Sequence, residues 1–238
     1  MTLLHVLVIA CIYVELYQCR DVDKFTCKLV AMKTVAIVSR KGGAGKTTLA
    51  IHLAVAAHLD GKQAALIDLD PQASATGWGD SRSAEEPTVI SAQAARLPKV
   101  LDAAATSEAD IAIIDTAPHS ENAALAAIRA ADLILIPCRP AILDLRAIGD
   151  TIDLVKLAKK TSVFIVLNAV PSRGSLADEA IQALSVYQIG IAPPRIGQRT
   201  AFVHALTSGQ SAQEYEAQGK AAEEIQTLYT WTCSTVNM

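Results

Sequence analysis

The sequence contains few aromatic residues and no cysteine spacing that is typical of a metal site. Aromatic residues make up 4% of the 238 residues and charged residues 19%, whereas 51% are hydrophobic. The five cysteines include no CxxC pair, so neither a disulfide framework nor a zinc site is indicated. The high apolar fraction excludes extensive disorder. Twelve glycines and nine prolines are too few for a collagen-like or Pro/Gly-rich chain.

The chain also lacks an excess of basic residues. Its net charge is −3, so the overall charge gives no indication of nucleic-acid binding. Any contact with DNA would need a local basic patch or an assembly of several chains. The apolar run Leu3–Val14 is shorter than the roughly 20 residues that a membrane-spanning helix needs.

Residues 1–31 differ in character from the rest. No Lys or Arg precedes the apolar run and no small-x-small cleavage site follows it closely, unlike in a signal peptide. Met32 then opens MKTVAIVSRKGGAGKTT, which reads as a natural protein start. We therefore expect an atypical extension over 1–31, from a misassigned start site or peripheral to the fold, with a membrane anchor as the alternative. A single domain over 32–230 and a frayed tail over 231–238 are predicted to follow.

From Lys33 onward, short apolar segments alternate with helical ones. Buried strands are predicted in 33–39, 63–70, 108–118, 131–138, 162–170 and 189–194. Helices are predicted over 47–60, 121–131, 143–160, 175–187, 198–207 and 211–229, and a loop over 71–85. This alternation predicts an α/β fold with a single doubly wound, mostly parallel sheet and helices on both faces. Ligands of such folds bind at the carboxyl ends of the strands.

The most specific feature is a glycine-rich loop between the first predicted strand and helix. It reads Lys41 followed by GGAGKT over 42–47, which is the setting of a phosphate-binding loop. The glycines allow successive N–H groups to point at phosphate oxygens, and the helix N-terminus adds partial positive charge. Lys46 would reach the β- and γ-phosphates, and the Thr47 hydroxyl would bind Mg²⁺. The sequence therefore predicts a P-loop nucleoside triphosphatase.

The loop departs from the general P-loop pattern, because Arg40 occupies the first glycine position and Lys41 precedes a double glycine. This KGGxGKT form resembles the ParA/MinD family of deviant Walker-type ATPases, which hydrolyse ATP. The resemblance covers Met32 to about Leu228 and implies that Lys41 reaches the ATP of a partner subunit across a nucleotide sandwich dimer, with Lys41, Lys46 and Asp70 catalytic. It places the nucleotide against Gly42, Gly43, Ala44, Gly45, Lys46, Thr47 and Thr48.

Carboxylates end the second and third predicted strands. Asp68 and Asp70 are two residues apart, so both could face the phosphate loop. The resemblance implies that Asp70, in a DxDPQ motif, positions the attacking water and helps hold the Mg²⁺ shell, whereas Asp68 supports the loop. Asp115 has the expected form of a second Mg²⁺ anchor that acts through water. A cap or an ion pair with Lys46 remains the structural alternative for Asp68 and Asp70, and a cap alone remains the alternative for Asp115.

Two further strand ends are candidates for contacts with the base. Asn168 follows the fifth predicted strand, and Pro194 follows the sixth. In the family these strand ends flank the adenine, so Asn168 could donate to the base and Pro194 could pack on its edge. A polar strand terminus without any ligand is the alternative for Asn168.

Segment 196–216 is similar to the corresponding region of small plasmid-partition ParA proteins that lack an N-terminal helix-turn-helix. That resemblance implies an ATP-dependent homodimer, which in some relatives assembles into filaments, and which binds DNA nonspecifically in the ATP state. A centromere-binding adaptor would stimulate hydrolysis, and the protein would be cytoplasmic and associated with the nucleoid. Candidate DNA contacts are Lys156, Lys160, Arg195 and Arg199. The alternatives are a MinD-like membrane-positioning ATPase and a DNA-transfer accessory ATPase; the acidic last helix does not supply the basic anchor that the first alternative needs.

Overall fold

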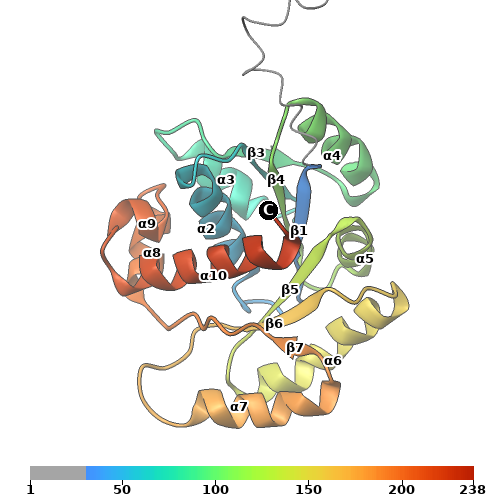
Figure 1. The fold of residues 1–238 in the computed structure, drawn as a ribbon, viewed down its shortest axis with the longest axis vertical. Helices are drawn as coiled ribbons and strands as arrows, with labels where there is room; N and C mark the ends of the chain where they lie inside the picture. The colour runs from blue at the N-terminus through green and yellow to red at the C-terminus, as the bar shows by residue number, and fades with distance from the viewer. Residues whose placement is uncertain (1–30) are drawn as a thin grey trace, which may run out of the picture. The chain divides into compact units, whose positions relative to one another are not determined.

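Seven strands form one sheet in a computed structural model, which describes residues 31–238 (Figure 1). The strand order is β3-β2-β4-β1-β5-β6-β7, and every neighbouring pair is parallel. The strands are β1 Lys33–Ile37, β2 Ala64–Asp68, β3 Thr88–Ser91, β4 Ile111–Asp115, β5 Leu133–Cys138, β6 Val163–Leu167 and β7 Gly190–Ile191. The predicted parallel, doubly wound sheet is confirmed. The expected extension over 1–31 lies, except for its last residue, outside the described residues.

Helices cover both faces of the sheet, because alternate strand residues enter two separate cores. In β1, Val35 and Ile37 pack into one core, and Ala36 packs into the other. The first core is covered by α2 Lys46–Leu59, α3 Ser74–Asp80, α8 Thr200–Thr207, α9 Ala212–Tyr215 and α10 Lys220–Val236. The second is covered by α4 Leu97–Thr106, α5 Glu121–Ala130, α6 Ile142–Leu157 and α7 Leu176–Leu184. Figure 1 shows the two groups on opposite sides of the sheet.

The loop predicted over 71–85 is wrong in its middle, where α3 forms. Gly77 and Gly79 lower the helix propensity of this segment and hide it from a sequence pattern. Tertiary contacts compensate, because Trp78 is buried and its Nε1 donates to the carbonyl of Gln210 at 3.3 Å. The sequence pattern also predicts no element over 86–107, where β3 and α4 lie.

The C-terminal end differs from the prediction in two ways. The helix predicted over 211–229 is interrupted between Tyr215 and Lys220, so that α9 and α10 are separate helices. The predicted tail over 231–238 is wrong, because α10 continues to Val236. The last turns of α10 pack against the core, where Thr232 and Val236 are buried. The Trp231 ring contacts the Phe164 ring edge-on, with 4.9 Å between the ring centroids.

Candidate functional site

The carboxyl ends of β1, β2 and β4 bring the loop and the carboxylates together. In the strand register Asp115 pairs with Ile37 on one side and with Asp68 on the other. The chain leaves β1 after Ile37 into the glycine-rich loop, and it leaves β2 toward Asp70. Because all strands are parallel, these ends lie at the same edge of the sheet, as the sequence predicted.

The glycine-rich loop adopts a conformation that depends on glycine. Gly43 and Gly45 have φ angles of 71° and 97°, in the left-handed region that other L-residues avoid. Gly45 is the N-cap of α2, and no side chain caps that helix. The first-turn N–H groups of α2 are therefore open to an anion, and the helix dipole favours negative charge there.

A cavity of about 290 Å³ lies over this helix end. Five predicted loop residues line it together with Asp70. The loop residues are Gly43, Gly45, Lys46, Thr47 and Thr48. No role is predicted from the sequence for the four other lining residues, Gln72, Ser74, Pro118 and Arg139, although Gln72 ends the DxDPQ motif. Arg139 could have been noticed as a basic residue directly after a predicted strand.

Both lysines of the loop have partners within the chain. Lys46 is 6% exposed, and its Nζ donates to the carbonyl of Lys41 at 3.2 Å. Burial lowers the pKa of Lys46, while the nearby carboxylates of Asp115 and Asp70 oppose that shift. The Nζ of Lys41 lies 3.2 Å from the Oδ2 of Asp144 in the first turn of α6. The loop therefore carries one buried cation, which lines the cavity, and one partly exposed cation that pairs with α6.

Asp68 and Asp70 have different surroundings. Asp68 is fully buried and accepts three hydrogen bonds. These come from the Asp70 N–H at 3.0 Å and from the N–H and hydroxyl of Thr76 at 2.9 and 3.1 Å. Asp70 is half-buried, lines the cavity and accepts the N–H of Gln72 at 2.9 Å. Asp68 thus holds the first turn of α3, which leaves Asp70 as the carboxylate that lines the cavity.

Asp115 is fully buried, yet neither of its carboxylate oxygens accepts a well-formed hydrogen bond. Burial raises its pKa to about 7, although the adjacent Thr47 hydroxyl and Lys46 ammonium favour the charged form. Buried acceptors without partners are rare, so a missing partner is expected. A hydrated divalent cation beside Thr47 fits, because Mg²⁺ prefers oxygen ligands and retains much of its water.

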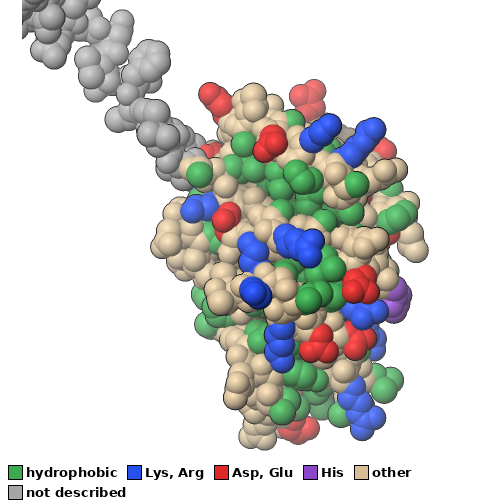
Figure 2. Space-filling model, turned by 90° about the vertical axis from the view of Figure 1, so that its right-hand side faces the viewer, with side chains coloured by type: hydrophobic (Ala, Val, Ile, Leu, Met, Phe, Trp, Pro, Cys, Tyr) green, Lys and Arg blue, Asp and Glu red, His purple; other side chains and the backbone are tan. Residues whose placement is uncertain are grey.

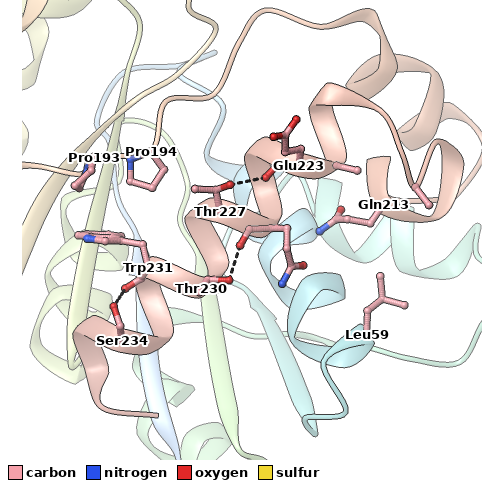
Figure 3. Close-up of a pocket in the computed structure, with 12 residues that line it drawn as sticks. Leu59, Pro193, Pro194, Gln213, Glu223, Thr227, Thr230, Trp231 and Ser234 are labelled. Carbon is pink, nitrogen blue, oxygen red and sulfur yellow. Dashed lines mark hydrogen bonds between the residues drawn. The ribbon is translucent and has the colours of Figure 1, made fainter.

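The two base-contact candidates lie in different places. Asn168 is 8% exposed, and its Nδ2 donates to the carbonyl of Ala44 in the loop at 2.7 Å. Pro194 is buried and lines a separate groove of about 880 Å³ beside α10 (Figure 3). That groove also contains Pro193 and Trp231 and shares no lining residue with the phosphate-loop cavity. A role of either residue at the base stays a prediction.

The four candidate DNA contacts are not equally available. Arg195 lies 3.1 Å from Asp178, and Arg199 forms an ion pair with Glu224 at 2.5 Å. Lys160 donates to the carbonyl of Ala131 at 2.8 Å, whereas Lys156 is exposed. In the face that Figure 2 shows, several Lys and Arg side chains gather in the middle, and Asp and Glu side chains lie mainly above and beside them. Within residues 31–238, no helix is long and apolar enough to cross a membrane.

The chain is similar in sequence and in fold to known nucleotide-binding proteins. Residues 35–211 match the family described as CobQ/CobB/MinD/ParA nucleotide binding domain. The chain is 30% identical to the maintenance of carboxysome distribution protein A of Gloeobacter kilaueensis, over 83% of this chain and 90% of that protein. It is 27% identical to Protein IncC of Escherichia coli, over 83% of this chain and 68% of IncC. A Cyanothece McdA variant in complex with ATP has the same fold, with a TM-score of 0.69 and 20% sequence identity. The match covers 87% of this chain and 97% of that structure's chain.

Proposed function

Since the chain belongs to the CobQ/CobB/MinD/ParA nucleotide-binding family, we propose that it is an ATP-hydrolysing switch that dimerises with ATP bound and then binds DNA nonspecifically. The observation that carries this proposal is the pair of lysines on one phosphate-binding loop. Lys46 lines the cavity, whereas Lys41 is partly exposed and lies 3.2 Å from Asp144. One lysine is thus placed for the chain's own nucleotide, and the other is near enough to the surface to act on a second copy.

The residues of the cavity suit ATP with Mg²⁺. The N–H groups at the start of α2 and the ammonium of Lys46 would bind the phosphates. Thr47 would bind the metal directly, and Asp70 and Asp115 would hold its water ligands. When bound, Mg²⁺ would neutralise charge that develops on the phosphate oxygens. Asp70 lines the same cavity from the β2 side, where its carboxylate can orient a water molecule.

On dimerisation, Lys41 would leave Asp144 of its own chain and bind the phosphates of a second subunit. In the single chain the ammonium of Lys41 pairs with Asp144, and both side chains are partly exposed. Breaking such a pair costs only about 0–1 kcal/mol. The phosphates of a second subunit can therefore compete for Lys41. A positive charge supplied by a partner would make hydrolysis depend on assembly.

Two candidates remain for the cargo that this switch would position. We favour DNA partition, in which the cargo is a plasmid or a chromosome. A centromere-binding adaptor would stimulate hydrolysis. The chain itself would be cytoplasmic and would associate with the nucleoid in the ATP state. Protein IncC and Protein ParA of Rhizobium radiobacter are relatives, at 27% and 26% identity. The relative from Gloeobacter kilaueensis, named for carboxysome distribution, favours a second candidate in which the cargo is a protein compartment. In both candidates the switch would attach to DNA with ATP bound.

The test is DNA binding by the full chain with ATP, with ADP and without nucleotide, at about 50 and 200 mM salt. We expect binding with ATP only, weakened by salt and independent of DNA sequence. Lys46→Ala serves as the control that cannot load the switch. ATP-dependent dimers without DNA binding would refute the DNA role and retain the switch, whereas no nucleotide binding would refute both. Adding a centromere complex or a purified compartment then distinguishes the cargoes.

A further inference from the structure

We propose that Asn168 is a positioning residue that holds the glycine-rich loop in its phosphate-binding conformation. The proposal rests on the proposed function only in that the loop binds a triphosphate. It assigns to Asn168 an effect on phosphate binding itself, which the base contact predicted from the sequence does not include.

The first argument is where the side chain lies. Asn168 follows β6, and its backbone N–H donates to the carbonyl of Cys138 at 2.9 Å. The main chain is therefore held by the neighbouring strand β5. From this fixed position the Nδ2 crosses to the carbonyl of Ala44 at 2.7 Å, and both residues are buried. A rigid strand end thereby restrains a loop that is 124 residues away in sequence.

The second argument is the close fit between the amide and the loop. A Cβ placed on Gly45 would lie 2.1 Å from the Nδ2 of Asn168 and 3.3 Å from its Cγ. The side chain therefore packs directly over the Gly45 backbone, where φ is 97°. Neither partner can shift far without losing this contact, so the left-handed turn and the Asn168 rotamer support each other.

The third argument concerns what the loop requires. When successive N–H groups point toward an anion, carbonyl groups of the loop point away and need donors of their own. Two of them receive side-chain donors: Lys46 donates to Lys41, and Asn168 donates to Ala44. Lys46 must turn to the phosphates when a nucleotide binds. The Asn168 bond needs no such change, so it is the restraint that can persist through binding.

The experiment compares two probes on the same variants. Binding of Mg·ATP and of magnesium tripolyphosphate, which has no base, is measured by calorimetric titration of the full chain. The variants are Asn168→Ser and the nearly isosteric Asn168→Asp, which loses the amide donor. Asn122→Ser, at an exposed position on α5, is the matched control. Titration reports affinity separately from the number of active sites, so partly unfolded protein lowers the stoichiometry and leaves the dissociation constant interpretable.

We expect both Asn168 variants to weaken ATP and tripolyphosphate by a similar factor of about ten, the equivalent of one hydrogen bond. Amide hydrogen exchange over 42–47 should also become faster in both. A loss confined to ATP would overturn the proposal in favour of a base contact, and unchanged binding of both probes would overturn it outright. If the wild-type chain bound neither probe, the nucleotide function itself would fail, which is a distinguishable result.

Discussion

Replacing Asp115 by Asn should stabilise the chain in the absence of nucleotide and metal, by an amount that grows as the pH rises from about 4 to about 7. Burial raises the pKa of Asp115 from 3.8 to about 7, so the folded state holds a proton that the unfolded state has released. Stability must therefore fall as the pH rises between these two values. At about 1.4 kcal/mol for each pH unit, the full cost approaches about 4 kcal/mol. The neutral amide of Asn avoids this cost.

The assay is urea unfolding of the wild type and of Asp115→Asn at pH 5 and pH 8, without nucleotide or Mg²⁺. We expect the variant to gain about 4 kcal/mol at pH 8 and about 1–2 kcal/mol at pH 5, a difference of about 2–3 kcal/mol between the two pH values. Asp102→Asn, at an exposed site on α4, should show no such dependence. An equal effect at the two pH values, or destabilisation at pH 8, would show that the buried carboxylate is not the source of the cost. Saturating Mg·ATP should stabilise the wild type more than the variant.

Two other substitutions test the assigned roles. Lys46→Ala should abolish ATP binding, measured by ATP titration. Asp70→Ala should permit binding but slow hydrolysis by at least about a hundredfold, measured by phosphate release. Equal behaviour of the two variants would contradict the separation of roles. Asp144→Asn should release Lys41 and lower the ATP concentration needed for dimers by a few-fold in analytical ultracentrifugation, because a partly exposed ion pair near the surface is worth about 0–1 kcal/mol. Weaker dimers in that variant would show that Asp144 supports the assembled state.

The central strands that the sequence predicted share one property, which is a continuous apolar pattern. β1, β2, β4, β5 and β6 are buried on both faces, so their strands appear as uninterrupted hydrophobic runs. β3 lies at the sheet edge, with its four residues exposed or half-buried, and has no such run. α3 is short and contains two glycines. Its stability comes from partners that are distant in sequence, which no local pattern can reveal.

The candidate site follows the same division. The loop over 42–47 and the carboxylates at the ends of β2 and β4 are adjacent in space because parallel strands end at one edge, so sequence reasoning could place them. Arg139 comes from the β5–α6 connection and Asp144 from the first turn of α6, and no sequence motif marks either residue. The sequence identifies Asn168 as a polar strand end, but its partner, the Ala44 carbonyl, is a backbone group and therefore has no sequence signature.

Charge counting shows why the DNA surface is harder to predict than the nucleotide site. By sequence alone, acidic residues such as Glu214 and Glu224 make the C-terminal segment a poor DNA surface. In the structure Glu214 is bound by the buried Arg82 at 2.8 Å, and Glu224 is bound by Arg199. Two acids and two bases thus cancel in pairs, and one of those bases, Arg199, is itself a DNA candidate. The surface field depends on the charges that remain unpaired, so Lys156→Glu should reduce DNA affinity more than Arg199→Glu if attachment is electrostatic.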